Sequence, residues 1–513
     1  MSFNESHAKE GIRTLDYIRS KGVILWTKNG RLHFRAPKGV LTPDDVERLR
    51  DASGQIIATL ERLSKAADAD TEIHPRVRFE RAPVSFSQLA YWNVAQLARR
   101  PSVRHLAAAT RLQGQLDLGL LHQSLGRMIQ RHEALRTRVV VVDDMPVQHI
   151  DREIECQIRI IDLSAAPRAD QDHLIKSRVH QLMLEPVDVT KGPLFIVGLL
   201  KLARDEHVLV VAMEHLISDA KSVGILMRDL LAAYVCLANR EEPGLPSLPV
   251  QFADYATWLQ DIYRPCIERR AEEWTRHLHG CPTLEFPEAD AVDPSAGGWG
   301  ATPVEIPLHM KERLLQWSRS KGTTVVMAVL VVYVATLLCW CRAEQTVVRY
   351  QTDGRFNSKV QHAIGYFATV LYLRVCVTDS TSFSELLSRV TREYCAAHEH
   401  ADFSYIDAQL PRLESASAPT FNWVPQSAST FNATSPLICS PIEFPAPALD
   451  GPKDERDPAL LLYEGPSDIS GSLLFPRHRF SEASMRQFVR TFMLLLGGLL
   501  RDEDRPIRGF PLQ

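Results

Sequence analysis

The segment VLVVAMEHLISDAKSVGILMRDLLAAYV (residues 208–235) places an apolar strand directly before an amphipathic helix. Its first six residues are apolar and rich in valine, which is typical of a buried strand. From Lys221 onward, apolar side chains recur at helical spacing. The connection between the two holds Glu214, His215 and Asp219. Two interpretations of His215 are open: it takes part in chemistry at this turn, or it is a core histidine held by Asp219.

The length and composition of the chain limit its class. At 513 residues it is too long for one hydrophobic core, so we expect two or three domains. With 45% hydrophobic and 24% charged residues it has the composition of an ordinary globular protein. A formal net charge of -3 gives no reason to expect attraction to nucleic acid or to a membrane surface.

The cysteines and the apolar segments point to the cytoplasm. The nine cysteines include no CxxC pair, which favours reduced thiols over a disulfide framework or a zinc site. The first twenty residues lack the apolar segment of a signal peptide. The uncharged run at residues 323–341 is about as long as a membrane span, but no basic cluster flanks it. We therefore interpret that run as a buried helix of a large domain.

Residues 1–65 form a unit of their own. In VILWTKNGRLHFRAP, two strand-like runs flank Asn29-Gly30, a pair typical of a tight hairpin turn. The second run alternates Arg31, His33 and Arg35 with apolar residues, so one face of the hairpin is cationic. Between positions 21 and 38 there are five bases and no acid. This pattern fits either a solvated hairpin face or a docking surface that accepts an acidic peptide as an added strand.

A polar linker at residues 66–80 leads to a region in which strands and helices alternate. We expect one lobe at 81–250 and another at 251–513, because EEPGLPSLPV at 241–250 is rich in proline and glycine, as crossovers are. In the first lobe, five apolar residues predict one face of a single helix: Leu121, Leu125, Met128, Ile129 and Leu135.

The motif EHLISDA (residues 214–220) resembles HHxxxDG, the core motif of condensation domains in nonribosomal peptide synthetases. Further segments, taken in chain order, resemble other motifs of that family, so the resemblance covers about residues 80–513. These segments are SFSQLAYW (85–92), RHEALRT (131–137), FADYATW (252–258), IGYFATVLYLR (364–374), the looser match HADFSYID (400–407), and FNWVP (421–425).

The resemblance implies an α/β (α+β) fold. Two lobes, each similar to chloramphenicol acetyltransferase, are expected to form a V with a central tunnel, with the core motif midway along it. Residues 1–65 are similar to the β-hairpin docking domains of such synthetases, which capture a short acidic tail on an upstream carrier protein. The residues expected to contact that tail are Lys21, Lys28, Arg31, His33, Arg35 and Lys38.

His215 matches the histidine that the family assigns to catalysis. A neutral imidazole can accept a proton near neutral pH. The resemblance therefore implies that His215 receives the proton of the acceptor, or holds the nucleophile by hydrogen bonding. The thioester on the phosphopantetheine arm of a partner carrier protein supplies the activation, so we expect no bound cofactor and no metal.

Asp219 has two possible roles. It could orient the imidazole, as in a catalytic triad. The resemblance implies instead that it pairs with an arginine of the second lobe and is structural. The segment RYQTDGR offers Arg355 as the first candidate and Arg349 as the second.

Two residues depart from the family motif. Glu214 stands where the family has its first histidine, and Ala220 stands where it has glycine. We expect Glu214 to be a structural substitution. Ala220 adds a methyl group where a close backbone approach is expected.

The expected reaction is acyl transfer from a carrier protein to an amine or hydroxyl, giving an amide or an ester. The nucleophile could be a small free molecule or a group bound to a second carrier protein. Neither an adenylation signature nor the GGxS site of a carrier domain is present, so we expect a free-standing enzyme, monomeric, that releases a chain in nonribosomal peptide or hybrid polyketide biosynthesis. A non-catalytic docking scaffold and an epimerisation-type relative are the alternatives. The DxxxxD motif of cyclisation domains is absent from this position.

Overall fold

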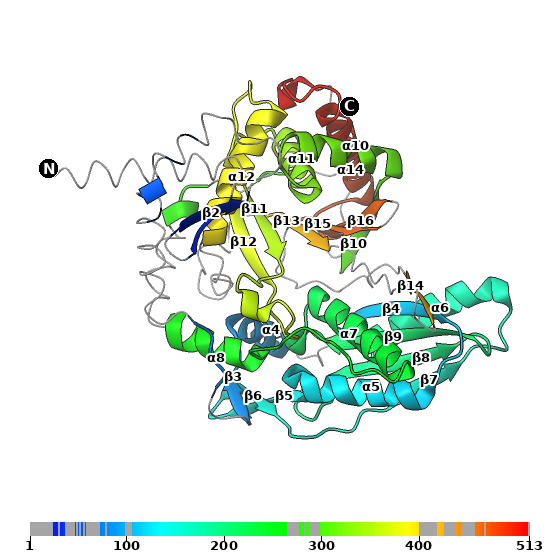
Figure 1. Cartoon of the computed structure of the whole chain (residues 1–513). Coiled ribbons are helices and arrows are strands. Elements are labelled where there is room, and N and C mark those ends of the chain that lie inside the picture. Colours follow the sequence, from blue (N-terminus) through cyan, green and yellow to red (C-terminus); the bar gives the residue numbers. More distant parts are fainter. Residues whose placement is uncertain are drawn as a thin grey trace.

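Two mixed α/β lobes follow one another along the chain and lie one above the other in Figure 1. Each lobe has one large sheet with helices packed against it. The computed structural model describes residues 24–28, 31–35, 47, 50, 53–54, 57, 72–76, 80–97, 105–263, 276–281, 284–287, 298–399, 418–424, 437–442, 457–465 and 468–510.

The main sheet of the first lobe is covered by helices on both faces. In sheet order its strands are β14 (Ile438–Ile442), β4 (His105–Gln113), β9 (Glu206–Glu214), β8 (Phe195–Lys201) and β7 (Ile158–Asp162), and its helices are α5 (Leu118–Arg131), α6 (Arg168–Met183) and α7 (Ala220–Ala238). Along β9, Leu209 and Val211 pack with α5 and α7, whereas Val208 and Val210 pack with α6. This alternation buries nearly the whole strand, which explains its continuous apolar sequence and confirms the predicted strand and helix at 208–235.

A second, three-stranded sheet and three helical segments complete the first lobe. They are β3 (Arg81–Pro83), β6 (Met145–Ile150), β5 (Thr137–Val142), α4 (Phe86–Leu97), η1 (Glu133–Arg136) and α8 (Phe252–Tyr263). Helix α8 packs against β3 and η1, yet its Leu259 belongs to the core of the second lobe. The start of the region that we assigned to the second lobe therefore bridges both lobes.

Helix α5 ends earlier than the sequence predicted. Leu121, Leu125, Met128 and Ile129 are buried on one face, as expected, but the helix ends at Arg131. Leu135 is also buried, but it belongs to the short helix η1 that follows. Tertiary contacts end the helix, because they satisfy its last carbonyl groups: Gln251 Nε2 donates to Arg131 O at 3.0 Å and Arg136 Nε donates to Ile129 O at 3.0 Å.

The second lobe has a six-stranded sheet in which β13 runs parallel to both its neighbours. In sheet order the strands are β10 (Trp299–Ile306), β16 (Ile469–Pro476), β15 (Ala459–Glu464), β13 (Thr420–Val424), β11 (Gln345–Thr352) and β12 (Thr369–Cys376); the helical segments are α10 (Leu308–Ser320), α11 (Val325–Trp340), η4 (Ser358–Val360), α12 (Phe383–Glu399), α14 (Glu482–Leu499) and η5 (Ile507–Gly509). The remaining strands pair antiparallel.

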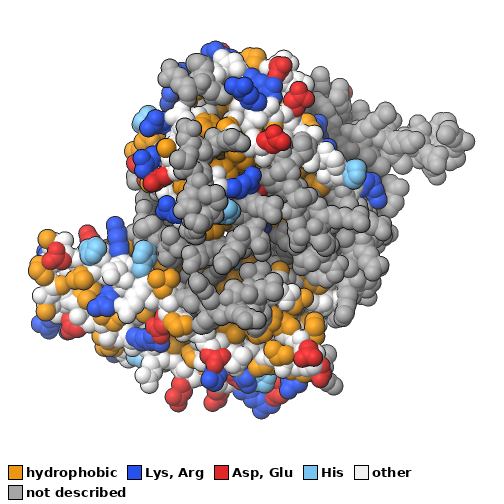
Figure 2. All heavy atoms as spheres, turned by 180° about the vertical axis from the view of Figure 1, so that it is seen from behind, with side chains coloured by type: hydrophobic (Ala, Val, Ile, Leu, Met, Phe, Trp, Pro, Cys, Tyr) orange, Lys and Arg blue, Asp and Glu red, His pale blue; other side chains and the backbone are white. Residues whose placement is uncertain are grey.

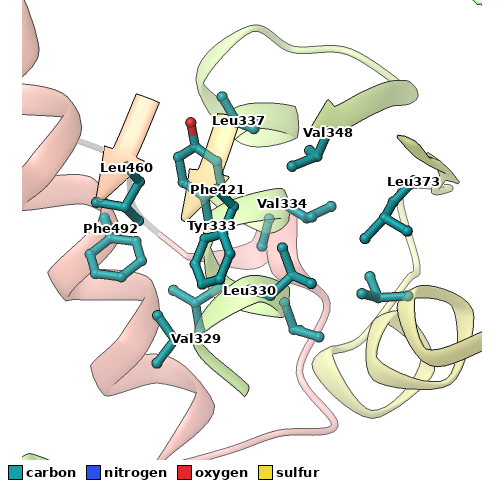
Figure 3. Packing of buried hydrophobic residues seen from close by; sticks show 14 of the residues in the cluster. Val329, Leu330, Tyr333, Val334, Leu337, Val348, Leu373, Phe421, Leu460 and Phe492 are labelled. Atoms are coloured by element: carbon teal, nitrogen blue, oxygen red, sulfur yellow. The ribbon is translucent and has the colours of Figure 1, made fainter. Parts of the chain in front are cut away.

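The apolar run at 323–341 forms α11, the central helix of this lobe. Figure 3 shows its Leu330 and Tyr333 among side chains of the sheet and of α14. Fourteen of its sixteen residues are buried, which explains why it has no polar face. Within the described residues no single helix is long and apolar enough to cross a bilayer, and α10 with α11 reaches that length only as a pair bent by 102°.

Strand β14 crosses between the lobes. It follows β13 in the chain, but it pairs antiparallel with β4 at the edge of the first lobe's sheet, with Ile438 opposite Gln113. Nothing in the sequence of this strand indicates the exchange.

Arg76 joins three separate parts of the chain. It lies in the segment that precedes the first lobe, and its guanidinium contacts Glu133 Oε2 at 2.5 Å and Asp254 Oδ1 at 2.7 Å. All three side chains are at least nine-tenths buried. In the same segment, Ile73 is fully buried against Phe252 and other residues of the lobe junction. Within the described part of the linker, Ile73 and Arg76 are therefore packed into the junction.

The amino-terminal unit contains a two-stranded antiparallel hairpin, β1 (Ile24–Lys28) and β2 (Arg31–Arg35). Lys28 lies opposite Arg31, as a two-residue turn requires. Four of the six expected docking residues, Lys28, Arg31, His33 and Arg35, occupy these strands, and their side chains lie outside the described part of the structure. Lys21 and Lys38 lie outside the described residues altogether.

Charges of both signs are mixed over the described surface of both lobes on the face seen in Figure 2. This distribution agrees with the formal net charge of -3. It forms no extended field of one sign on the described part of that face.

Candidate active site

His215 lies where β9 ends and α7 is about to begin. The short helical turn η2 (His215–Ile217) connects them, and the half-buried imidazole sits at its start. The ring Nδ1 is 2.9 Å from Ser218 O. A carbonyl oxygen can only accept a hydrogen bond, so Nδ1 carries the proton in the neutral ring. The lone pair then resides on Nε2, which is the atom able to accept a proton.

Two tyrosines flank the imidazole, one from each lobe. The ring centroid of Tyr366, from the second lobe, lies 4.3 Å from that of His215, and the ring of Tyr91, on α4, lies 5.6 Å away. The two tyrosine rings are 6.2 Å apart and perpendicular. The three rings therefore form an aromatic cluster at the junction of the lobes.

Glu214 is buried at the end of β9, and Tyr91 Oη donates to its Oε1 at 3.0 Å. Its backbone oxygen accepts a hydrogen bond of 2.9 Å from Ser218 Oγ. Gln88, also on α4, donates from Nε2 to Leu216 O at 2.6 Å. The carboxylate that replaces the family's first histidine thus takes part in the contacts that attach α4 to the turn.

The carboxylate of Asp219 forms a buried bidentate ion pair with Arg355. Its Oδ2 lies 2.8 Å from Nη1 and its Oδ1 lies 3.0 Å from Nη2. The backbone amide of Phe367 donates to Oδ2 at 3.0 Å, and that of Ser222 donates to Oδ1 at 2.8 Å. Both carboxylate oxygens are thereby engaged by donors other than His215. The arginine comes from the second lobe, as the resemblance implied, and it is Arg355 and not Arg349, which lies on β11.

Arg355 and Ser222 extend this ion pair into a network between the lobes. Arg355 Nη2 donates to Ser222 Oγ at 2.8 Å and to Ala363 O at 3.2 Å, and its guanidinium lies 4.4 Å from the ring centroid of Phe367. The hydroxyl of Ser222 donates to Gly365 O at 2.8 Å and accepts from Gly365 N at 3.1 Å. Asp219 and Arg355 are each at least 97% buried, so the pair is shielded from solvent.

The expected close approach at Ala220 stays a prediction. Ala220 is the exposed first residue of α7. Close approaches within the protein lie in the second lobe. A Cβ on Gly365 would come within 2.1 Å of the Phe252 ring, and one on Gly354, at φ +64°, within 1.7 Å of Phe367 O.

A second group of ionisable residues is buried near the end of α5. His132 Nε2 lies 3.9 Å from Asp229 Oδ2, too far for a direct hydrogen bond, and Arg228 contacts the same carboxylate at 2.6 Å. Burial lowers the pKa of His132 below its ordinary value. Burial raises the pKa of Asp229, but His132 and Arg228 outweigh that effect, and its pKa is lowered.

Three residues of the site were missed by the sequence analysis: Tyr91, Tyr366 and Ser222. Each lies in or next to a segment that resembles a family motif, but neither its residue type nor its spacing distinguishes it from its neighbours in the sequence. Among the described residues, no group of three or more His, Cys, Asp or Glu side chains could hold a metal ion.

Comparison with known families establishes the family to which the chain belongs. Residues 79–511 match the model of the condensation domain. The chain belongs to the condensation domain family. Residues 13–62 of this condensation protein match the TubC N-terminal docking domain.

The curated relatives are much longer than this condensation protein. Malpinin synthetase of Mortierella alpina is 28% identical over 453 residues, which are 87% of this chain and 6% of that protein. Tyrocidine synthase 3 of Brevibacillus parabrevis is 27% identical over 453 residues, or 86% of this chain and 7% of that protein. The chain therefore spans less than a tenth of the length of these two relatives.

Solved structures agree with the fold. The cyclization-docking bidomain of EpoB from Sorangium cellulosum has a TM-score of 0.72 at 21% identity and covers 96% of this chain and 98% of its own. A structure described as the basis for condensation domain-mediated chain release from the enacyloxin polyketide synthase has a TM-score of 0.70 at 21% identity, with 95% of each chain covered. The X-domain from teicoplanin biosynthesis has a TM-score of 0.70 at 23% identity and covers 86% of this chain and 100% of its own.

Proposed function

We propose that this condensation protein transfers an acyl chain from the phosphopantetheine thioester of a carrier protein to an amine or hydroxyl acceptor. The observation that carries the proposal is the state of His215. Its Nδ1 is fixed by Ser218 O, so the proton-accepting Nε2 belongs to a half-buried ring at the turn between β9 and α7. Membership of the condensation domain family supports the same reaction.

The reaction needs one proton to be moved. As the nucleophile attacks the thioester carbonyl, a C–N or C–O bond forms and the C–S bond breaks. His215 Nε2 accepts the proton of the nucleophile and returns it to the departing thiolate. A positioned base of this kind typically contributes about 10² to 10⁴-fold to the rate, and alignment of the two substrates contributes further. The donor arrives on its carrier, so the reaction requires no cofactor bound to this chain.

In this proposal the other motif residues are structural. Asp219 and Arg355 join the lobes, Glu214 anchors α4 through Tyr91, and Ala220 begins α7. Their contacts support these roles, since each carboxylate is engaged by donors from elsewhere in the fold.

The docking domain would supply the donor. The match of residues 13–62 to a docking family supports an upstream acyl or peptidyl carrier protein as the partner. We propose that the bases of the hairpin, from Lys21 to Lys38, bind an acidic tail on that carrier. Replacing Arg31 and Arg35 by glutamate should then abolish calorimetrically measured binding of an acidic peptide, whereas lysine at both positions should retain it.

We propose that the transfer releases the chain from its carrier. The similarity in fold to the condensation domain of the enacyloxin synthase supports this role, and the acceptor would then be a small amine or alcohol. The tunnel between the lobes that would admit both substrates stays a prediction.

The test uses carrier proteins loaded with a panel of acyl groups, a panel of amines and alcohols, and mass spectrometry of the products. Wild type should form product, His215→Ala should lose about 10² to 10⁴-fold in rate, and the exposed His122→Ala should match wild type. Carrier binding without product in any combination would favour a non-catalytic scaffold, and racemised acyl chains would favour an epimerisation-type activity. Full turnover by a folded His215→Ala would refute the role of the imidazole.

A further inference from the structure

The imidazole of His215 has aromatic rings from both lobes beside it. The ring centroids lie 4.3 Å from Tyr366 and 5.6 Å from Tyr91, and the imidazole is tilted to these rings by 44° and 46°. Both distances are within the range of about 6 Å over which an aromatic ring attracts a cation. Tyr366 is half-buried and comes from the segment between η4 and β12. Its distance from His215 along the chain means that only the assembled lobes bring the two rings together.

Proton transfer to His215 changes the strength of its contact with the aromatic rings. When Nε2 accepts a proton, the ring becomes an imidazolium, and its positive charge is attracted to the negative face of a neighbouring aromatic ring. The hydrogen bond from Nδ1 to Ser218 O is compatible with both states, because the carbonyl accepts in both. The aromatic contact, in contrast, gains strength only once the charge has formed.

We propose that Tyr366 is a positioning residue that stabilises the protonated form of His215 from across the lobe junction. The proposal rests on the proposed function, in which His215 accepts a proton. A general base benefits from a contact that favours its charged form during the reaction.

Tyr91 assists from the first lobe. Its hydroxyl donates to the buried carboxylate of Glu214, which increases the electron density of its ring. Tyr91 and Tyr366 are titratable groups whose rings lie beside the imidazole, and the Glu214 carboxylate contacts Tyr91. The carboxylate of Asp219 is directed to Arg355. Among these groups, Tyr366 has its ring centroid nearest to the imidazole in the described contacts.

The proposal is tested by titrating the histidine ring directly. Protein labelled with ¹³C at Cε1 of histidine is followed by NMR from about pH 5 to pH 8, and the signal of His215 is assigned by its loss in His215→Gln. In Tyr366→Leu, the midpoint of this titration should move to lower pH by about half a unit, which is about a threefold loss in proton affinity. Tyr366→Phe keeps the aromatic face and should titrate with wild type.

The exposed His122 serves as an internal reference whose midpoint should stay constant in all variants. If Tyr366→Leu does not fold, it is replaced by Tyr366→Met, because methionine is also non-aromatic and is more flexible than leucine. Equal midpoints for wild type and the aliphatic variant overturn the role of Tyr366. The titration uses no substrate, so it is separate from the transfer assay: an active His215→Ala overturns the proposed function without altering the titration result.

Discussion

Asp219 shows how a buried ion pair can hold two lobes together. Replacing Asp219 by alanine leaves Arg355 buried without its carboxylate and also removes the acceptor for two backbone amides. We expect a loss of about 3 to 5 kcal/mol in the free energy of unfolding, measured by chemical denaturation. The matched variant at the exposed Asp172, which pairs with Arg111, should lose less than about 1 kcal/mol.

The double variant Asp219→Ala with Arg355→Ala completes a thermodynamic cycle. Because the second substitution removes the stranded charge, the combined loss should be smaller than the sum of the single losses. Additive losses would mean that the two side chains do not interact as the structure indicates.

His132 makes the unfolding free energy depend on pH. Burial lowers its pKa in the folded state, so below its ordinary value of about 6.5 the unfolded chain binds the proton first. The contribution of the buried neutral imidazole to the free energy of unfolding is therefore fully present above that pH, and it is lost as the pH falls below it. The drop in unfolding free energy between about pH 7.5 and about pH 5.5 should be smaller in His132→Gln than in wild type. Other buried histidines with lowered pKa values, such as His105, keep the drop from vanishing. If His132→Gln lost as much unfolding free energy between these pH values as wild type, burial would not lower the pKa of His132. The exposed His122→Gln is the control.

At this scale the segments that resemble family motifs led to His215, Asp219 and Arg355. The structure pairs Asp219 with Arg355, whereas the catalytic role of His215 stays a prediction. It did not identify Tyr366 or Ser222. Their importance comes from contacts made across the lobe junction, and neither their residue type nor their spacing indicates which residue they will meet.

Two glycines show that the same substitution can act in opposite directions in different elements. Gly126 is exposed inside α5, and a Cβ there would meet nothing within 4 Å. Gly126→Ala should therefore raise the free energy of unfolding by about 0.5 to 1 kcal/mol, since alanine favours the helix. Gly354 has a positive φ and its Cβ would collide with Phe367 O. Gly354→Ala should lower the unfolding free energy by more than about 1 kcal/mol. Thermal and chemical denaturation of both variants check this, and equal effects would contradict it.

Secondary structure was predictable wherever the apolar pattern was long. The buried strand at 208–213, the helix after it and the central helix α11 follow directly from their sequences. The end of α5 did not follow, because Gln251, more than a hundred residues away, supplies a hydrogen bond that replaces the next helical turn. The exchange of β14 was equally inaccessible, since its short sequence carries no indication of which sheet it joins.

The contacts of Arg76 determine how firmly the linker is attached to the body of the molecule. Arg76→Met keeps the length of the side chain but leaves Glu133 and Asp254 buried near each other without their shared cation. We expect a loss of about 3 to 5 kcal/mol in unfolding free energy. Limited proteolysis should also cut the chain sooner between residues 72 and 80. The exposed Arg152→Met, which breaks a surface pair with Glu80, is the matched control and should stay close to wild type. A rate of proteolysis equal to that of wild type in Arg76→Met would mean that the other contacts of the segment, such as buried Ile73 and the ion pair of Glu72 with Lys359, hold it in place.

The exchange of β14 bears on how the protein is made and how it can be divided. Until the ribosome has synthesised residues 438–442, the nascent first lobe presents β4 as a bare edge, and bare strand edges recruit other chains. Expression of the first lobe alone is accordingly an aggregation hazard, and a split of this protein into two fragments must supply β14 in trans to the fragment that lacks it.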